Sequence, residues 1–120
     1  MSANTIAAIE GLVDSHPNLM PILTESREDN FGEVLPHLVL GDIMQWLASH
    51  VRTDARTCRS VLDWMERQYD RSPEDVQELF VVSGVEMIPD PGEAGSELRA
   101  FLGPVLRGFD PWGSGPEYLR

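Results

Sequence analysis

The stretch that decides the fold is residues 72–97, SPEDVQELFVVSGVEMIPDPGEAGSE. Its first residues are typical of a helix start, because the Ser72 hydroxyl suits an N-cap and Pro73 suits the first helical position. Two acidic side chains follow at Glu74 and Asp75, where negative charge complements the positive end of the helix dipole. We therefore expect a helix that begins at Ser72.

The rest of this segment is apolar on nearly every side. The apolar positions are Val76, Leu79, Phe80, Val81, Val82, Val85, Met87 and Ile88. A helix with so little polar surface must be covered by other helices. Pro89, Pro91 and Gly92 would end it. The sequence therefore predicts a buried central helix over residues 72–87.

Apolar residues at helical spacing predict further helices on both sides of this segment. These helices are expected over residues 4–15, 18–30, 34–52, 53–69 and 96–106. Gly41 lies inside one of them, where glycine costs about 1 kcal/mol relative to alanine, and we expect it to let another helix approach closely. The sequence thus predicts an all-α single domain of five or six antiparallel-packed helices, with a short superhelix of the helical-repeat kind as a variant.

The helical domain is expected to span residues 1–106. Residues 107–120 have turn composition and are expected to form a loosely ordered C-terminal tail. Phe109 and Trp112 are the tail residues that can pack back on the domain or on a partner.

Length and composition predict one domain in the bacterial cytoplasm. The 120 residues suffice for one core, and they contain no membrane-length apolar run and no pattern typical of a signal peptide. The single cysteine, Cys58, fits a reducing compartment. All nine basic residues are arginine, which is typical of GC-rich bacterial genomes.

The charge of the chain favours a basic partner. Twenty acidic residues against nine basic ones give a net charge of −11. Residues 1–33 carry six acidic and one basic residue, net −5, and residues 71–97 carry seven and one, net −6. Nucleic acid would be repelled, whereas a basic protein would be attracted and steered. The alternative is that the charge only keeps the protein in solution.

Two clusters of carboxylates are the candidate partner-binding residues. The N-terminal acidic cluster consists of Glu25, Glu28, Asp29 and Glu33, and the C-terminal acidic cluster consists of Glu86, Asp90, Glu93 and Glu97. The first is placed unfavourably at the negative end of a helix dipole, and the second flanks an exposed Pro/Gly loop. Trp112 or Tyr118 is a candidate aromatic anchor beside them.

Catalytic and metal-binding patterns are weak, so no cofactor, no metal and no enzymatic activity are expected. His16, His37 and His50 lack metal-ligand spacing, and Cys58 has no histidine near it in sequence. We expect His37 to serve the fold by capping or by bonding to backbone. The weakest alternative is a small hydrolase-like enzyme that uses His37, Asp42 and Glu86.

Three segments resemble a family of small bacterial proteins of unassigned function. They are FGEVLPHLVLGDIMQWL, SPEDVQELFVVSGVEMIPDPGE and ELRAFLGPVLR, and the likeness covers about residues 18–107. The positions that carry it are Gly32, Glu33, Leu35, Pro36, His37, Gly41, Asp42, Glu74, Asp75, Val76, Gln77, Leu79, Glu86, Leu102, Gly103 and Pro104. Such proteins resemble immunity proteins, which are encoded beside polymorphic toxins and neutralise them by binding.

The resemblance and the charge together imply a non-enzymatic role. The first hypothesis is an immunity protein whose acidic surface docks on the basic cleft of a cognate secreted toxin. The alternative is a helical adaptor or regulatory protein-binding module with no toxin as its partner. An open reading frame for a long repeat-containing protein directly upstream would favour the first hypothesis.

Overall fold

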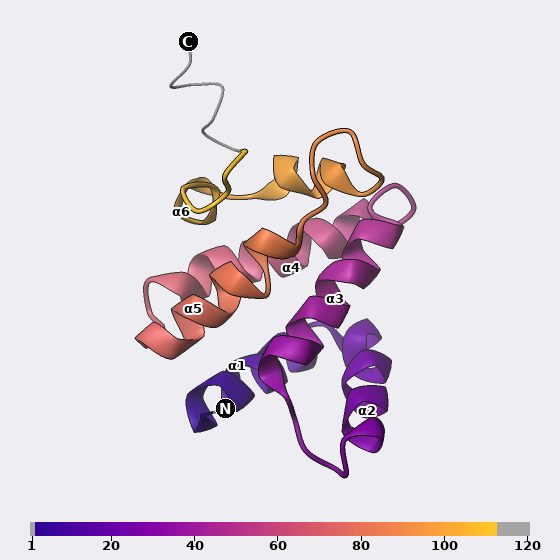
Figure 1. The fold of residues 1–120 in the computed structure, drawn as a ribbon, viewed down its shortest axis with the longest axis vertical. Coiled ribbons are helices and arrows are strands. Elements are labelled where there is room, and N and C mark those ends of the chain that lie inside the picture. Colours follow the sequence, from indigo (N-terminus) through magenta and orange to yellow (C-terminus); the bar gives the residue numbers. More distant parts are fainter. Residues whose placement is uncertain (1, 113–120) are drawn as a thin grey trace.

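The computed structural model describes residues 2–112 of the chain, and Figure 1 shows their arrangement. These residues form six α-helices and three short 3-10 helices and include no β-strand, so the predicted all-α class is confirmed. The elements are α1 (Ala3–Ser15), η1 (Pro17–Leu19), α2 (Met20–Asp29), α3 (Pro36–His50), α4 (Ala55–Tyr69), α5 (Glu74–Val82), η2 (Val85–Met87), η3 (Ser96–Phe101) and α6 (Pro104–Arg107).

The helix around which the others are arranged is α3. It packs against α1, α2, α4 and α5, and it also contacts η2 and η3 (Figure 1). The prediction that residues 72–87 form the centre is therefore wrong in position, because α5 is one wall of the fold. The packing of α1 against α5 closes the domain, whereas in a helical repeat each unit contacts only its neighbours. The superhelix variant does not describe this closed arrangement.

The start of α5 differs from the prediction. Ser72 does not cap the helix, since its hydroxyl donates to the Gln68 carbonyl at 2.7 Å and so belongs to the end of α4. Pro73 takes the N-cap position with extended backbone, and the helix begins at Glu74. The acidic first turn is as expected, with Glu74 and Asp75 at the positive end of the dipole.

The end of α5 lies at Val82, earlier than the predicted Met87. The chain turns tightly at Gly84, where an added β-carbon would lie only 2.3 Å from the Phe80 carbonyl oxygen. No other residue fits there without moving the backbone. The apolar pattern nevertheless continues, because Val85 and Ile88 are also buried after the turn.

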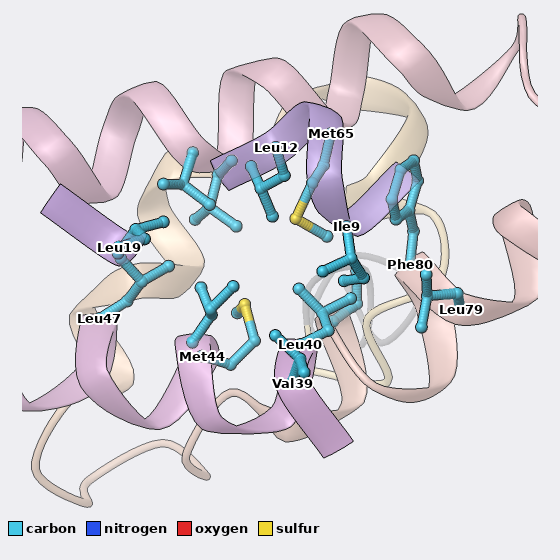
Figure 2. Packing of buried hydrophobic residues seen from close by; sticks show 14 of the residues in the cluster. Ile9, Leu12, Leu19, Val39, Leu40, Met44, Leu47, Met65, Leu79 and Phe80 are labelled. Carbon is cyan, nitrogen blue, oxygen red and sulfur yellow. The ribbon is translucent and has the colours of Figure 1, made fainter. Parts of the chain in front are cut away.

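A single core joins the four long helices and α5's apolar face. Figure 2 shows Ile9 and Leu12 of α1, Met44 of α3, Met65 of α4 and Phe80 of α5 pointing toward one another. Phe80 is 1% exposed, and its ring meets the Trp64 ring edge-on with 6.1 Å between centroids. The T-shaped contact is a favourable geometry for two aromatic rings.

No other helix of residues 2–112 packs closely against Gly41, contrary to the prediction. An added β-carbon there would meet only the end of the Met87 side chain, at 3.9 Å. That distance is an ordinary van der Waals contact, so the expectation is wrong.

The last predicted helix is interrupted at Gly103–Pro104, as expected, and forms η3 and α6. The carboxylate of Glu66 accepts from the Val105 amide at 2.8 Å and the Leu106 amide at 3.0 Å, so α4 caps the start of α6. These two bonds satisfy amides that have no partner inside the helix.

The first residues of the predicted tail are tied to the domain. Asp110 is buried, and its carboxylate accepts from Arg99 Nε at 2.6 Å and from the Trp112 amide at 3.1 Å. The Phe109 ring lies against Tyr69, with 5.3 Å between centroids. Residues 113–120, including Tyr118, lie outside the described part of the chain.

No helix among residues 2–112 combines the length and the apolar composition that a membrane crossing requires.

Candidate binding groove

The structure divides the C-terminal acidic cluster into two pairs with different roles. The Glu93 carboxylate accepts from the Asp90 amide at 3.0 Å and so closes its own turn. Glu97 accepts from the Gly95 amide at 3.2 Å and from Arg52 Nε at 2.5 Å. Hydrogen bonding to its own backbone amide, and then to Arg52, lowers the pKa of Glu97. These two carboxylates therefore hold the loop together, and only part of their charge is available to a partner.

The other pair, Glu86 and Asp90, lies beside Trp112. All three line a surface hollow of about 350 Å³ together with Arg99 and Phe109. Trp112 is 49% exposed there. The structure thus brings together three of the residues that the sequence nominated for partner binding, although Arg99, which pairs with Asp110, also lines this hollow.

The N-terminal acidic cluster lies on the second half of α2 and on the loop that follows it. Glu25, Glu28, Asp29 and Glu33 are all exposed, and none of them has an ion pair within residues 2–112. Glu25 and Asp29 are four residues apart and face α3, whereas Glu28 lines a smaller hollow with Arg27 on another side of α2. Figure 1 shows this loop at the opposite end of α3 from residues 89–95.

A groove of about 650 Å³ runs between α2 and α3. Glu25 and Asp29 line one wall of it, and Asp42 and Trp46 line the other. The full lining is Ile22, Glu25, Ser26, Asp29, Asn30, Leu38, Asp42, Gln45, Trp46, Ser49 and His50. Three carboxylates thus share one concave surface with an aromatic side chain.

The aromatic wall of the groove is a stacked pair. The rings of Trp46 and His50 lie nearly parallel, with 4.0 Å between centroids and an interplanar angle of 13°. His50 Nδ1 donates to the Trp46 carbonyl at 2.8 Å, since a carbonyl oxygen can only accept. This bond fixes the histidine ring on the tryptophan and leaves Nε2 free of that contact. The pair is therefore a firm platform rather than two independent side chains.

The sequence nominated only one wall of this groove. Glu25 and Asp29 were in the predicted set, but Asp42, Trp46 and His50 were not proposed as a partner-binding surface. A signal was present, because Leu38, Asp42, Trp46 and His50 recur every four residues and so share one face of a helix. That face combines a carboxylate with two aromatic rings, which is unusual for a face turned entirely to the core.

The residues of the enzymatic alternative occupy three different settings. His37 Nδ1 lies 2.6 Å from the Ser83 hydroxyl, so the histidine joins the start of α3 to the end of α5. This contact is a side-chain bond between elements rather than the cap or backbone bond that was expected. Asp42 lines the α2–α3 groove, whereas Glu86 lines the hollow beside Trp112.

Cys58 is fully buried in α4, and its thiol donates to the Leu47 carbonyl at 3.4 Å. Burial, followed by the negative charge of Asp54, raises its pKa to about 11. A thiol with that pKa stays protonated near neutral pH, which does not favour nucleophilic chemistry. Among residues 2–112 no group of three or more histidine, cysteine, aspartate or glutamate side chains is arranged to hold a metal ion.

Fold and groove together define a small all-α protein with an acidic, aromatic-lined groove on one side. The chain belongs to the family described as a domain of unknown function, DUF7674, whose model matches residues 9–109. The match includes every described helix except part of the first and ends close to the buried Asp110. No match was found among the curated proteins or among the solved structures.

Proposed function

We propose that this protein is an immunity protein, which binds a basic protein toxin in the bacterial cytoplasm and neutralises it. The observation that supports the proposal is the α2–α3 groove, where Glu25, Asp29 and Asp42 share one concave surface with Trp46. Carboxylates beside an aromatic face are the combination that recognises a guanidinium or ammonium group.

The chemistry of the groove suits an arginine or lysine side chain of the partner. The apolar stem of such a side chain would lie along the Trp46–His50 platform, and its charged end would reach the carboxylates. The planar guanidinium of arginine suits both contacts better than the compact ammonium of lysine, because it stacks on rings and bonds carboxylates in pairs. We therefore expect arginine to be the preferred occupant.

The charge of the whole chain supports the same class of partner. A net charge of −11 attracts a basic protein over long range and repels nucleic acid. A toxin that acts on a phosphate-containing substrate would present a basic cleft, and an acidic protein seated in that cleft would exclude the substrate. Inhibition would then require no chemistry on the part of the immunity protein.

Neutralising the two α2 carboxylates tests the groove. With the protein encoded by the neighbouring gene as the probe, the double variant Glu25→Gln/Asp29→Gln is expected to weaken binding by about tenfold or more, because charge-assisted contacts in the groove are lost. Isothermal calorimetry measures the dissociation constant, and co-expression with the toxin measures protection of growth.

The matched control is Glu74→Gln/Glu78→Gln on α5, which removes the same charge from exposed positions outside the groove. It is expected to change binding by no more than about twofold. Equal losses in both double variants would show that only net charge matters and would remove the groove from the proposal. Binding without protection of growth would favour the adaptor over the immunity protein.

A further inference from the structure

Phe31, at the end of α2, is the most exposed apolar side chain in the described structure. Its relative exposure is 101%, whereas the other exposed large apolar side chains of residues 2–112 lie between 41% and 51%. A phenyl ring that touches nothing in its own domain contributes no packing energy to the fold. The fold therefore gives no hydrophobic reason for an aromatic residue at this position.

The backbone of Phe31 is also unfavourable for the residue type. Its φ is 57°, the one positive φ among non-glycine residues 2–112. The Gly32 amide donates to the Arg27 carbonyl at 2.7 Å, which closes the helix with a motif whose left-handed position is usually glycine. A β-carbon is disfavoured in that conformation, so phenylalanine occupies a position where glycine would suit the fold better.

The turn holds the backbone of Phe31 in a fixed position. The Asn30 side chain donates to the Ser26 carbonyl at 2.6 Å, and the Glu33 amide donates to the Asn30 carbonyl at 3.0 Å. With the Gly32 bond, these contacts fasten both sides of Phe31 to the end of α2. Because the backbone is already ordered, binding has to order only the two side-chain torsions of the ring, which favours affinity.

We propose that Phe31 is the apolar anchor of the partner interface and inserts into an apolar pocket on the basic partner. The inference rests on the proposed function and extends the acidic groove to the end of α2. Glu28 and Asp29 precede the ring in the chain and Glu33 follows it, so arginine or lysine residues at the rim of the partner's pocket would face carboxylates. Aromatic side chains are enriched among binding hot spots, and the rim around the core of an interface is polar.

The same carboxylates disfavour the other surfaces that bind exposed aromatic rings. An anionic lipid surface would repel Glu28, Asp29 and Glu33. A second copy of this chain would bring equal negative charge to the contact, since each copy carries −11. A basic protein with an apolar pocket would accommodate the Phe31 ring and attract the carboxylates near it.

Replacing Phe31 by glycine separates a binding role from a folding role. Phe31→Gly is expected to melt at the wild-type temperature or above it, because glycine relieves the left-handed backbone. The same variant is expected to bind the neighbouring-gene product about 30-fold or more weakly by calorimetry. Phe31→Trp is expected to retain most of the affinity, and Val82→Ala, at an exposed apolar position on α5, is expected to change it by no more than about twofold.

Each other result would overturn the inference in a recognisable way. Wild-type binding by Phe31→Gly would remove Phe31 from the interface and leave the groove proposal standing. A lower melting temperature for Phe31→Gly would assign the ring to the fold. If the wild-type protein sediments as a dimer and Phe31→Gly sediments as a monomer, the Phe31 ring would be assigned to self-association. Wild-type protein that fails to bind the neighbouring-gene product would overturn the proposed function itself and the anchor with it.

Discussion

Phe80→Ala is expected to lower the free energy of unfolding by about 3–5 kcal/mol, as for other large-to-small aromatic substitutions in a core. The ring is 1% exposed and lies between α5 and the Trp64 ring of α4. Removing it leaves a cavity where α1, α4 and α5 meet, because the helices cannot all move inward. Urea-induced unfolding followed by circular dichroism gives the value.

The control for this prediction is Val82→Ala, on the same helix but 44% exposed. Its expected cost is below about 1 kcal/mol, because few buried contacts are lost. A loss below about 1 kcal/mol in Phe80→Ala as well would mean that α5 does not belong to the cooperative core.

Asp110→Ala is expected to cost about 3 kcal/mol, which is the low end for breaking a buried ion pair. The Asp110 side chain is fully buried and that of Arg99 is 16% exposed, so the substitution would leave a cation with little access to water. It would also free the Trp112 amide, and Arg99 would keep only its bond to the Pro89 carbonyl among these contacts. The same unfolding measurement applies.

Arg52→Ala provides the comparison for an exposed ion pair. Arg52 is 84% exposed and pairs with Glu97, so its removal is expected to cost no more than about 1 kcal/mol. If Asp110→Ala costs as little as Arg52→Ala, then residues 107–112 are not part of the folded unit, and the prediction of a loosely ordered tail from residue 107 holds.

The sequence was most informative where a helix has one apolar face. For α1 and α4 the predicted limits, 4–15 and 53–69, fall within two residues of the observed Ala3–Ser15 and Ala55–Tyr69. The end of α5 was missed, because Val85 and Ile88 continue the apolar pattern after the chain has turned at Gly84. Local periodicity reports which residues are buried, but it does not report where the backbone changes direction.

The central position of α3 was missed for a related reason. The segment 72–87 has apolar residues on nearly every side, and this composition predicts a central position. Burial on all sides and contact with many elements are different properties, and only the second makes a helix central. α3 keeps a polar and aromatic groove face and still packs against four other α-helices.

The candidate site was half predictable. The charge pattern nominated Glu25 and Asp29. The second wall of the groove comes from α3, and local sequence patterns do not show which helix packs beside α2. Phe31 lies between the predicted helices 18–30 and 34–52 and was not nominated for binding, and residue type alone favours the neighbouring Gly32 for a left-handed conformation. In the structure Phe31 and Gly32 both have positive φ, at 57° and 85°. The sequence does not show whether one or both of these residues take a left-handed conformation.

Substitutions in the C-terminal acidic cluster are a poor test of binding, because two of its carboxylates also bond within the protein. Charge reversal at Glu93 and Glu97 would also break the bonds to the Asp90 amide and to Arg52. Substitutions at Glu25 and Asp29 carry no such structural cost among the bonds of residues 2–112, so the α2 carboxylates give the clearer test.

The rate of association with the neighbouring-gene product, measured by stopped flow at two salt concentrations, tests the central claim most directly. Exposed charges steer the encounter of two proteins and are screened by salt, whereas buried apolar contacts mainly set the rate of dissociation. Between about 50 mM and about 500 mM salt the association rate constant is expected to fall by about tenfold or more, with little change in dissociation. An association rate that is the same at both salt concentrations would contradict recognition of a basic partner by this acidic surface.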